Sequence, residues 1–321
     1  MIRISILSLK KALLSSISDS RQAFQMANEF LLQSGQPALF EVQLVGLSPE
    51  VALQDGLFTI RPDALIENIQ QTDLVIIPSL TGDVFSATNL NSDYIGWIAA
   101  QYKSGAEVAS LSVGAFLLAF SGLLNNRQCT THWLYANEFR TLYPGTRLAD
   151  DKMITDQKGL YSSGGSYWNL LLHLLEKYTD RELAIRISKY FVVDLDRNSQ
   201  SPFAVFRGIK DHEDLLVNEA QGYIEQHYRD KLTVDQLAGK FSTSRRTFER
   251  RFKNATSNTV VEYIQRVKIE AAKQQLETGR KTVGEVMYDV GYTDTKAFRD
   301  VFKKITGISP AVYREKYNTH L

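Results

Sequence analysis

VDQLAGKFSTSRRTFERRFKNATSNTVVEYI, residues 234–264, returns in altered form as VGEVMYDVGYTDTKAFRDVFKKITGISPAVYR, residues 283–314. Apolar positions of the first stretch recur 49 residues later in the second: Val234, Leu237 and Phe241 correspond to Val283, Val286 and Val290. Further on the offset is 50 residues, so that Phe248, Phe252, Lys253 and Tyr263 correspond to Phe298, Phe302, Lys303 and Tyr313. We conclude that the carboxyl-terminal third repeats one structural unit, with a longer turn in the second copy.

Each copy has the pattern of a helix, a short polar turn and a second helix. The first helix has apolar residues at i, i+3 and i+7, and the second has a Phe pair at i and i+4, which places them on one face of each helix. These are the parts of a helix-turn-helix unit. Between the copies, residues 259–279 have no proline and no glycine before Gly279, which predicts one helix of about 20 residues, roughly 30 Å long. Such a stiff spacer would let two recognition helices enter successive major grooves, roughly 34 Å apart.

Polar and basic side chains lie off the apolar stripe of the second helix in both copies, where they could donate to phosphates and guanine edges. The candidate DNA-binding residues are Arg245, Arg246, Thr247, Arg250, Arg251 and Lys253 in the first copy, and Thr295, Lys296, Arg299, Lys303 and Lys304 in the second. Basic residues on a helix can also be an ordinary solvated face. However, residues 216–321 hold 19 Lys and Arg against 13 Asp and Glu, whereas residues 1–215 hold 18 against 23. The basic repeat therefore favours double-stranded DNA as the partner.

Residues 1 to about 195 follow a different pattern, in which short apolar runs such as IRISILSL and TDLVIIPSL alternate with amphipathic segments. Strands without polar alternation are typical of a parallel sheet buried on both faces, so we expect an α/β sandwich with a doubly wound sheet. The stretch 194–208 has charge, Ser and Pro but little periodicity. We therefore expect an α/β domain over 1–195, a linker over 196–215 and an all-helical domain over 216–321.

Within the α/β domain, ASLSVGAFLLAFSGLL (109–124) predicts a strand, a sharp turn at Gly114 and a helix, with Ser112 where a nucleophile elbow holds its catalytic side chain. A serine nucleophile needs a base and an acid that orients the base, and the sequence offers no clear candidate for either. The carboxyl ends of such strands instead suit a polar ligand, which the hydroxyl and backbone N–H groups of the turn could bind. The candidate ligand-binding residues are Ser112, Val113, Gly114, His132 and Trp133.

The single cysteine, Cys129, excludes an internal disulfide framework and a multi-cysteine zinc site, and it suits a reducing compartment. Lys10 and Lys11 interrupt what would be the apolar core of a signal peptide. The uncharged run 108–124 is shorter than the ~20 apolar residues that a spanning helix requires. We therefore expect a cytoplasmic protein with no metal, no cofactor and no membrane partner.

The repeat resembles the DNA-binding domain of the AraC-type transcriptional regulators over residues 216–321, through LTVDQLAGKFSTSRRTFERRFK and VGYTDTKAFRDVFKKITGISPAVYR. The residues that follow the family pattern are Gly291, Phe298, Phe302, Gly307, Pro310, Tyr313 and Arg314. The sequence departs from the pattern where Met287 replaces the usual Ala, where Asp300 replaces a basic residue, and where Ser257 and Val260 replace Gly and Pro. Because Asp300 would repel phosphate, we expect the first unit to supply most of the base reading and the second to bind more weakly.

The first domain resembles the flavodoxin-like PfpI-type, class I amidotransferase-like domain that forms the sensor half of many AraC-type regulators. The similarity lies in SVGAFLLAFSGLLNNRQCTTHW (112–133), SSGGSYWNLLLHLLEKYTDRELAIRISKYFVV (162–193) and NSQSPF (198–203). In enzymes of this fold the elbow holds Cys, often followed by His, with an acidic residue after the first strand. Here Ser112 and Val113 occupy the elbow, and SLKKALLSS (8–16) has no carboxylate, so the resemblance implies a regulator without catalysis.

The resemblance further implies a small-molecule effector of the amino acid or quaternary amine class, whose cation an aromatic side chain would suit. Apolar faces of doubly wound domains often pair, so we also expect a homodimer. Two alternatives remain open. The α/β domain could be an amidase or hydratase that uses Ser112 in a protein that also binds DNA, or it could serve only as a dimerisation scaffold.

Overall fold

The chain forms two compact units, Met1–Gln200 and Ser201–Leu321, each with its own hydrophobic core. Its structure is a computed structural model that describes residues 1–195, 199–210 and 212–319. Part of the expected linker, residues 196–198 and 211, lies outside the described residues. Within the described ranges, no helix is both long and apolar enough to cross a membrane.

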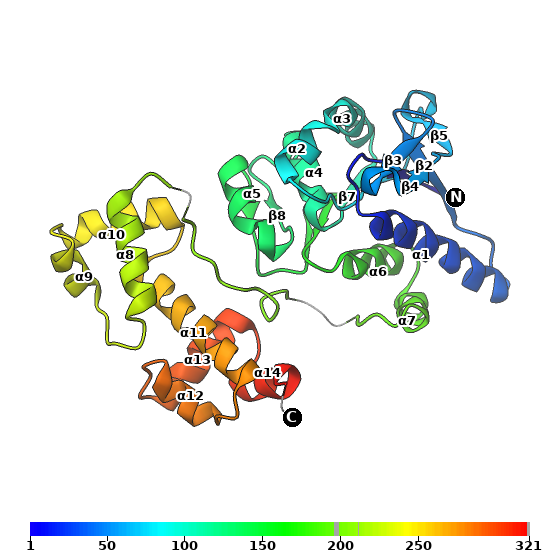
Figure 1. The fold of residues 1–321 in the computed structure, drawn as a ribbon. Helices are drawn as coiled ribbons and strands as arrows, with labels where there is room; N and C mark the ends of the chain where they lie inside the picture. Colours follow the sequence, from blue (N-terminus) through cyan, green and yellow to red (C-terminus); the bar gives the residue numbers. More distant parts are fainter. Residues whose placement is uncertain (196–198, 211, 320–321) are drawn as a thin grey trace. The chain divides into compact units, whose positions relative to one another are not determined.

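A seven-stranded sheet forms the centre of the first unit, in the order β10-β11-β7-β6-β1-β2-β5 (Figure 1). Its strands are β1 (Ile2–Leu7), β2 (Phe40–Gly46), β5 (Ala64–Leu65), β6 (Leu74–Ile77), β7 (Glu107–Ser110), β10 (Ile154–Asp156) and β11 (Leu160–Ser163). Neighbouring strands run parallel except for β10 and β11. This confirms the expected doubly wound parallel sheet, to which β10 adds an antiparallel edge.

Helices cover both faces of this sheet (Figure 1). One face carries α1 (Leu14–Gln33), α6 (Tyr167–Tyr178) and α7 (Arg181–Tyr190), and the other carries α2 (Val84–Asn89), α3 (Ile95–Lys103), α4 (Ala115–Phe120) and α5 (Ala136–Leu142). All of β6 is buried, which explains its uninterrupted apolar sequence. Strands β2 and β6 lie on opposite sides of β1, so the strand order reverses there and opens a crevice at the carboxyl ends of the strands.

Two small ribbons complete the first unit. They pair β3 (Val51–Leu53) with β4 (Phe58–Ile60), and β8 (Gln128–Cys129) with β9 (Arg147–Leu148). The second ribbon leads into the segment of His132 and Trp133, whose place beside the elbow is described below.

The second unit consists of helices joined by short turns. They are α8 (Leu215–Gln226), α9 (Val234–Lys240), α10 (Arg245–Thr256), α11 (Val260–Thr278), α12 (Val283–Asp289), α13 (Thr295–Thr306) and α14 (Pro310–Tyr317). Capping boxes at Thr233, Thr259 and Thr282 fix the starts of α9, α11 and α12. The two expected helix-turn-helix units are α9 with α10 and α12 with α13. The expected spacer is α11, whose 19 residues span about 28 Å.

The two helix-turn-helix units have separate cores of matching geometry. In the first, the rings of Phe252 and Tyr263 lie 5.3 Å apart at 82°, and in the second those of Phe302 and Tyr313 lie 5.5 Å apart at 78°. The repeat read from the sequence is therefore a repeat of side-chain packing as well.

The start of the second unit lies against its central helix α11 and last helix α14. The ring of Phe203 lies 6.4 Å from that of Tyr317, and the backbone N–H of Phe206 donates to Glu270 (3.0 Å). The carbonyl of Ala204 accepts a hydrogen bond from the buried ammonium of Lys273. Much of the segment expected as a linker is thus packed onto the helical unit.

Candidate functional site

The elbow is formed by the end of β7 and the start of α4. Ser112 has φ of 52°, a left-handed backbone conformation that strains a residue other than glycine. A Cβ on Gly114 would lie 2.5 Å from the carbonyl oxygen of Pro78, so the turn approaches the end of β6 too closely for a side chain. The strand, turn and helix expected from the sequence are confirmed, with the left-handed residue at Ser112 rather than at Gly114.

Neighbouring groups of the protein hold the backbone of the elbow. The N–H of Ser112 donates to the hydroxyl of Ser163 (2.8 Å), and its carbonyl accepts from the hydroxyl of Thr131 (3.0 Å). The N–H of Gly114 donates to the carbonyl of Leu111 (2.9 Å). The elbow therefore has fewer N–H groups left for a carboxylate ligand than the sequence suggested.

Ser112 has no activating base among the described residues. Its side chain is almost fully buried, and its hydroxyl makes no hydrogen bond to them. His132 uses Nδ1 to accept from the N–H of Leu134 (3.1 Å), and burial lowers the pKa of its imidazole. In the neutral ring Nε2 then carries the proton, so neither nitrogen is available to deprotonate the serine.

Two further chemistries find no support at this site. Burial raises the pKa of the Cys129 thiol to about 12, which keeps it protonated and unreactive. Within the ranges that the structure describes, no group of three or more His, Cys, Asp and Glu side chains is arranged to hold a metal ion.

On the recognition helix α10, two of the candidate side chains make contacts inside the unit. Arg251 donates through Nε and Nη2 to the carboxylate of Asp214, at 2.8 and 2.6 Å. This pair lowers the pKa of Asp214, chiefly through the hydrogen bonds from the guanidinium. Lys253 donates to the carbonyl of Ser257 (2.9 Å). Both side chains thus make contacts within the helical unit that help to hold α10 in place.

The remaining cations of α10 differ in their partners. Arg245 forms ion pairs with Asp235 (3.0 Å) and Glu249 (3.4 Å). Arg246 and Arg250 are exposed and have no ion pair with a described residue. They are therefore the two arginines of α10 without an ion-pair partner among the described residues.

Helix α13 presents more uncompensated charge than α10. Lys296, Arg299, Lys303 and Lys304 are exposed, and none forms an ion pair with a described residue. Asp300 lies exposed in their midst. The helix carries four cations against this one carboxylate.

The two threonines among the candidates lie at the starts of these helices. The hydroxyl of Thr247, in the first turn of α10, accepts a hydrogen bond from Ser244 (2.9 Å). Thr295 is the first residue of α13 and is exposed. Each is thus placed at the helix end that a recognition helix presents to base edges.

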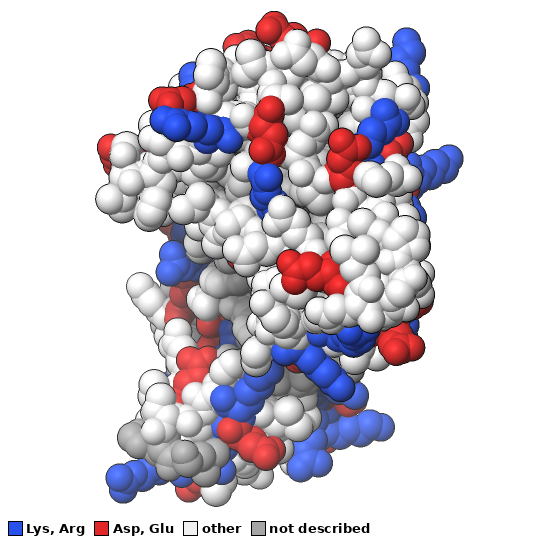
Figure 2. All heavy atoms as spheres, turned by 90° about the vertical axis from the view of Figure 1, so that its right-hand side faces the viewer, with Lys and Arg blue, Asp and Glu red and all other residues white. Residues whose placement is uncertain are grey.

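One carboxylate on α11 is affected by charges on both recognition helices. The pKa of Glu262 is lowered mainly by hydrogen bonds from Thr259, and also by the charges of Lys253 and Lys304. Lysines from both recognition helices thus act on a single group on α11. In Figure 2, Lys and Arg side chains are interspersed with Asp and Glu side chains among uncharged ones.

Comparison with known proteins gives the family of each unit. Residues 237–316 match the helix-turn-helix domain family, and residues 23–177 match the DJ-1/PfpI family. The chain thus combines these two domains in the architecture of the AraC-type transcriptional regulators. Among these regulators it is 26% identical over 315 residues to the HTH-type transcriptional regulator GbdR of Pseudomonas aeruginosa, covering 97% of this chain and 84% of that one.

Further similarities cover shorter parts of this chain. It is 26% identical over 211 residues to the regulator ArgR of Pseudomonas aeruginosa, covering 65% of this chain and 64% of that one. A solved structure from Vibrio parahaemolyticus is similar with a TM-score of 0.52 and 21% identity, covering 59% of this chain and 98% of that one. At that identity the likeness concerns the fold alone.

Gln200 lies beside the elbow, although the sequence pattern indicates no role for it beyond its place in the stretch NSQSPF. It is 1% exposed, and its Oε1 accepts from the N–H groups of Trp133 (3.1 Å) and Gly165 (3.0 Å). Its Nε2 donates to the carbonyl of Thr131 (2.9 Å). A Cβ on Gly164 would lie 2.7 Å from its amide carbon. Gln200 therefore fixes the wall beside the elbow, and only its contacts over long sequence distances reveal this.

An acidic side chain lies on α1, shortly after the segment 8–16 in which enzymes of this fold have one. Asp19 on α1 accepts hydrogen bonds from the hydroxyl of Tyr167 (2.8 Å) and from the indole N–H of Trp168 (3.1 Å). These two aromatic residues begin α6, directly after the turn of Gly164 and Gly165. Asp19 is thus an acidic group joined to aromatic side chains, which the segment 8–16 does not contain.

Proposed function

We propose that this chain regulates transcription by placing α10 and α13 in successive major grooves of one operator, in the cytoplasm. The observation that carries the proposal is the pair of matching helix-turn-helix units, each with exposed cations on its second helix. Phosphate contacts would supply affinity, and base edges would supply specificity.

The two helices would divide this task. Arg246 and Arg250 have their guanidinium donors free to form bidentate contacts with guanine, which favours base reading by α10. Helix α13 offers three lysines, Lys296, Lys303 and Lys304, which act as point charges toward phosphate. Arg299 and the first-turn residues Thr247 and Thr295 would add polar contacts.

Footprinting of the full chain on genomic DNA fragments tests this function. We expect two protected stretches whose centres lie about one helical turn apart. The double variant Arg246→Ala/Arg250→Ala should lose the protection of one stretch first, whereas Lys210→Ala, which removes a cation paired with Glu225 outside the recognition helices, should keep both. Absence of any protected fragment with the native chain would refute the proposal.

In the same proposal the α/β unit senses a ligand and performs no catalysis. Three features support a silent elbow: the hydroxyl of Ser112 lacks a base, His132 is held in a local hydrogen bond, and Cys129 stays protonated. The runner-up is an amidase or hydratase that uses the strained Ser112. Turnover of amide, peptide or isonitrile substrates that Ser112→Ala abolishes would favour that enzyme.

The effector would be a small polar molecule bound at the elbow by Ser112, Val113, Gly114, His132 and Trp133, of the amino acid or quaternary amine class. Asp19 with its aromatic partners offers negative charge beside π-systems, a combination that attracts an organic cation. Melting of the full chain in the presence of amino acids and quaternary amines tests this. A ligand at 100 times its Kd adds about 2.7 kcal/mol to the free energy of unfolding. If no compound of either class shifts the melting temperature, the α/β unit is a scaffold.

We also propose a homodimer formed through the α/β units. Phe85 and Leu90 at α2 and Phe120 on α4 are large apolar side chains exposed on two helices that contact each other. Sedimentation velocity should report a dimer for the native chain and a shift toward monomer for Phe85→Glu. A native chain that sediments as a monomer at all concentrations would contradict this assembly.

A further inference from the structure

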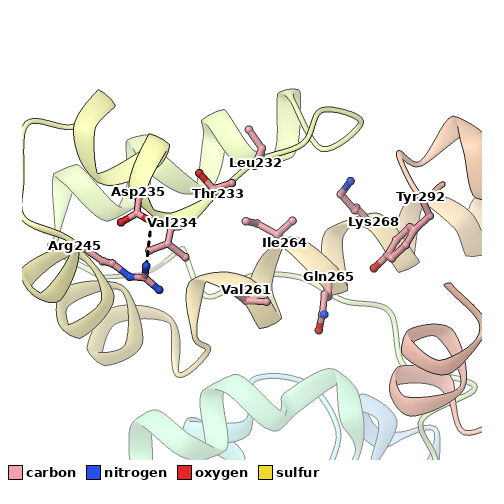
Figure 3. A pocket seen from close by; sticks show the side chains of 10 residues that line it. All are labelled: Leu232, Thr233, Val234, Asp235, Arg245, Val261, Ile264, Gln265, Lys268 and Tyr292. Atoms are coloured by element: carbon pink, nitrogen blue, oxygen red, sulfur yellow. Dashed lines mark hydrogen bonds and ion pairs between the residues drawn. The ribbon is translucent and has the colours of Figure 1, made fainter. Parts of the chain in front are cut away.

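A groove of about 410 Å³ runs along α11 between the two helix-turn-helix units (Figure 3). Its floor is one stripe of α11, formed by Val261, Ile264, Gln265 and Lys268. The ion pair of Asp235 with Arg245 lies toward one end in Figure 3, and Lys268 with Tyr292 lies toward the other. Along most of this groove the units are separated, so their relative orientation must be set by α11 and by contacts at the ends of the groove.

Lys268 makes such a contact. Its side chain is 7% exposed, and its ammonium donates to the carbonyls of Asp230 (3.3 Å) and Gly291 (3.2 Å). Asp230 belongs to the turn between α8 and α9, which leads into the first helix-turn-helix unit. Gly291 belongs to the turn that leads into α13 of the second helix-turn-helix unit. One side chain on the spacer therefore joins both units.

The turn at Gly291 is shaped around this contact. Gly291 has φ of 76°, and a Cβ there would lie 2.1 Å from the carbonyl oxygen of Arg229 and 2.8 Å from Nζ of Lys268. The ring of Tyr228, from the same turn of the first unit, packs against the second core. The turn of Asp230 and the turn of Gly291 thus meet directly, and the ammonium of Lys268 lies between their carbonyls.

The position of Lys268 is unfavourable unless those carbonyls hold it. Burial lowers the pKa of its ammonium, and the charge of Asp230 offsets part of this effect, although no described carboxylate lies within ion-pair distance; the ring of Tyr292 lies 5.4 Å from the ammonium. A buried ammonium is expensive to desolvate, and carbonyl oxygens compensate only part of that loss. An apolar residue would suit burial better, so what Lys268 adds is the hydrogen-bonded link itself.

We propose that Lys268 is a positioning residue that fixes the angle between the two helix-turn-helix units and so sets the half-site spacing that the chain accepts. This inference rests on the proposed two-site reading of DNA. A helix alone connects the units at one place and lets each rock on its own packing. A second connection closes a ring through α11, Lys268 and the two turns, and holds α13 at a set place relative to α10.

Binding of the full chain to spacing variants of its footprinted operator tests the proposal. The probes are three labelled duplexes: the native operator, one with an extra base pair between the half-sites, and one with the second half-site scrambled. Two rigidly joined modules lose affinity when their sites no longer match their spacing, and loosely joined modules lose less. We expect Lys268→Met to reduce the native chain's preference for the native spacing about threefold or more, with unchanged affinity for the scrambled duplex.

Lys273→Met is the matched control, because Lys273 is also a buried lysine of α11, but its ammonium donates to Ala204 and Glu270, lies over the ring of Tyr313, and makes no hydrogen bond to the two turns that Lys268 joins. It should keep the spacing preference. Lys268→Gln, whose shorter side chain cannot span both carbonyls, repeats the test if the Met variant does not fold. Folded Lys268 variants with the native preference would overturn the proposal. A native chain that fails to bind, or binds without regard to the second half-site, would instead refute two-site reading.

Discussion

The two helix-turn-helix units of this chain agree in their interiors and differ on their surfaces. Phe248 and Phe252 have rings 5.7 Å apart, and so do Phe298 and Phe302. On the surface, the position of Arg251, which pairs with Asp214, is occupied by Val301 in the second unit. Packing therefore constrains the duplicated core, whereas charge and helix ends are free to diverge toward different roles.

The largest expected effect tests whether the cores are equivalent. Phe252→Ala and Phe302→Ala each remove a fully buried ring, and each should lower the free energy of unfolding by about 3–5 kcal/mol. Urea unfolding of the full chain, followed by far-UV circular dichroism, measures both. A loss for one variant several times that of the other would show that the matching geometry hides unequal packing.

The next effect concerns DNA affinity and separates the two recognition helices. Arg250→Ala should weaken operator binding by about 1–3 kcal/mol if its guanidinium reads a base edge. Lys303→Ala on α13 should weaken binding less and reduce the slope of log K against log salt concentration by about one, as expected for a phosphate contact.

Fluorescence anisotropy at several salt concentrations distinguishes these outcomes for each variant. Equal affinity of Arg250→Ala and the native chain would remove Arg250 from base reading, and the same result for Arg246→Ala would remove α10. A larger loss for Lys303→Ala than for Arg250→Ala would reverse the expected ranking of the units.

The sequence predicted those parts of the molecule that depend on local pattern. Periodic apolar residues such as Phe252 and Phe302 predicted both cores, because their spacing reflects burial on one helix face. The absence of proline and internal glycine predicted α11. Uninterrupted apolar runs predicted the parallel sheet, and the small residue Gly114 predicted the tight elbow.

Contacts between segments far apart in the sequence could not be predicted from local pattern. Arg251 is a candidate DNA-binding residue, and no local pattern indicates that the fold brings Asp214 to its guanidinium from 37 positions away. Gln200 looks like part of a polar linker, but it is buried by the segments of Thr131 and Gly165. A single sequence carries no signal for such pairings, since neither hydrophobic period nor turn chemistry depends on them.

The pair of Asp214 with Arg251, which the second unit lacks, predicts a difference in acid sensitivity. The guanidinium of Arg251 lowers the pKa of Asp214 in the folded state. The pair therefore stabilises the first helix-turn-helix unit fully at pH values above the ordinary aspartate pKa of about 3.9, and this stabilisation is lost as the pH falls through the lowered pKa. Asp214→Asn keeps a capping side chain for α8 and should cost about 1 kcal/mol at pH 7, a modest value because both partners are partly exposed.

Unfolding in urea at pH 7 and at several acidic pH values below the ordinary aspartate pKa measures this, since the difference between the two chains should shrink as the pH falls through the lowered pKa of Asp214. Asp294→Asn is the control, because Asp294 caps α13 and has no ion pair with a described residue. A constant difference between Asp214→Asn and the native chain at all of these pH values would contradict the role of the ion pair.

The smallest effect concerns the ends of the recognition helices. Helix α10 is followed by Ser257 with φ of 58°, and α13 by Gly307 with φ of 79°. The backbone is therefore in the left-handed conformation at the end of both helices. A Cβ is disfavoured there by about 1–2 kcal/mol, and glycine's greater freedom in the unfolded chain offsets part of the gain from removing it. Ser257→Gly should therefore raise the free energy of unfolding by about 0.5–1 kcal/mol, and Gly307→Ser should lower it by a similar amount.

Thermal unfolding of both variants beside the native chain measures this opposition. The carbonyl of Ser257 that accepts from Lys253 belongs to the backbone, so the glycine variant retains that hydrogen bond. A Ser257→Gly chain that melts below the native one would mean that the serine hydroxyl stabilises the turn by more than its backbone conformation strains it. The two units would then have reached the same helix end by different energetic routes.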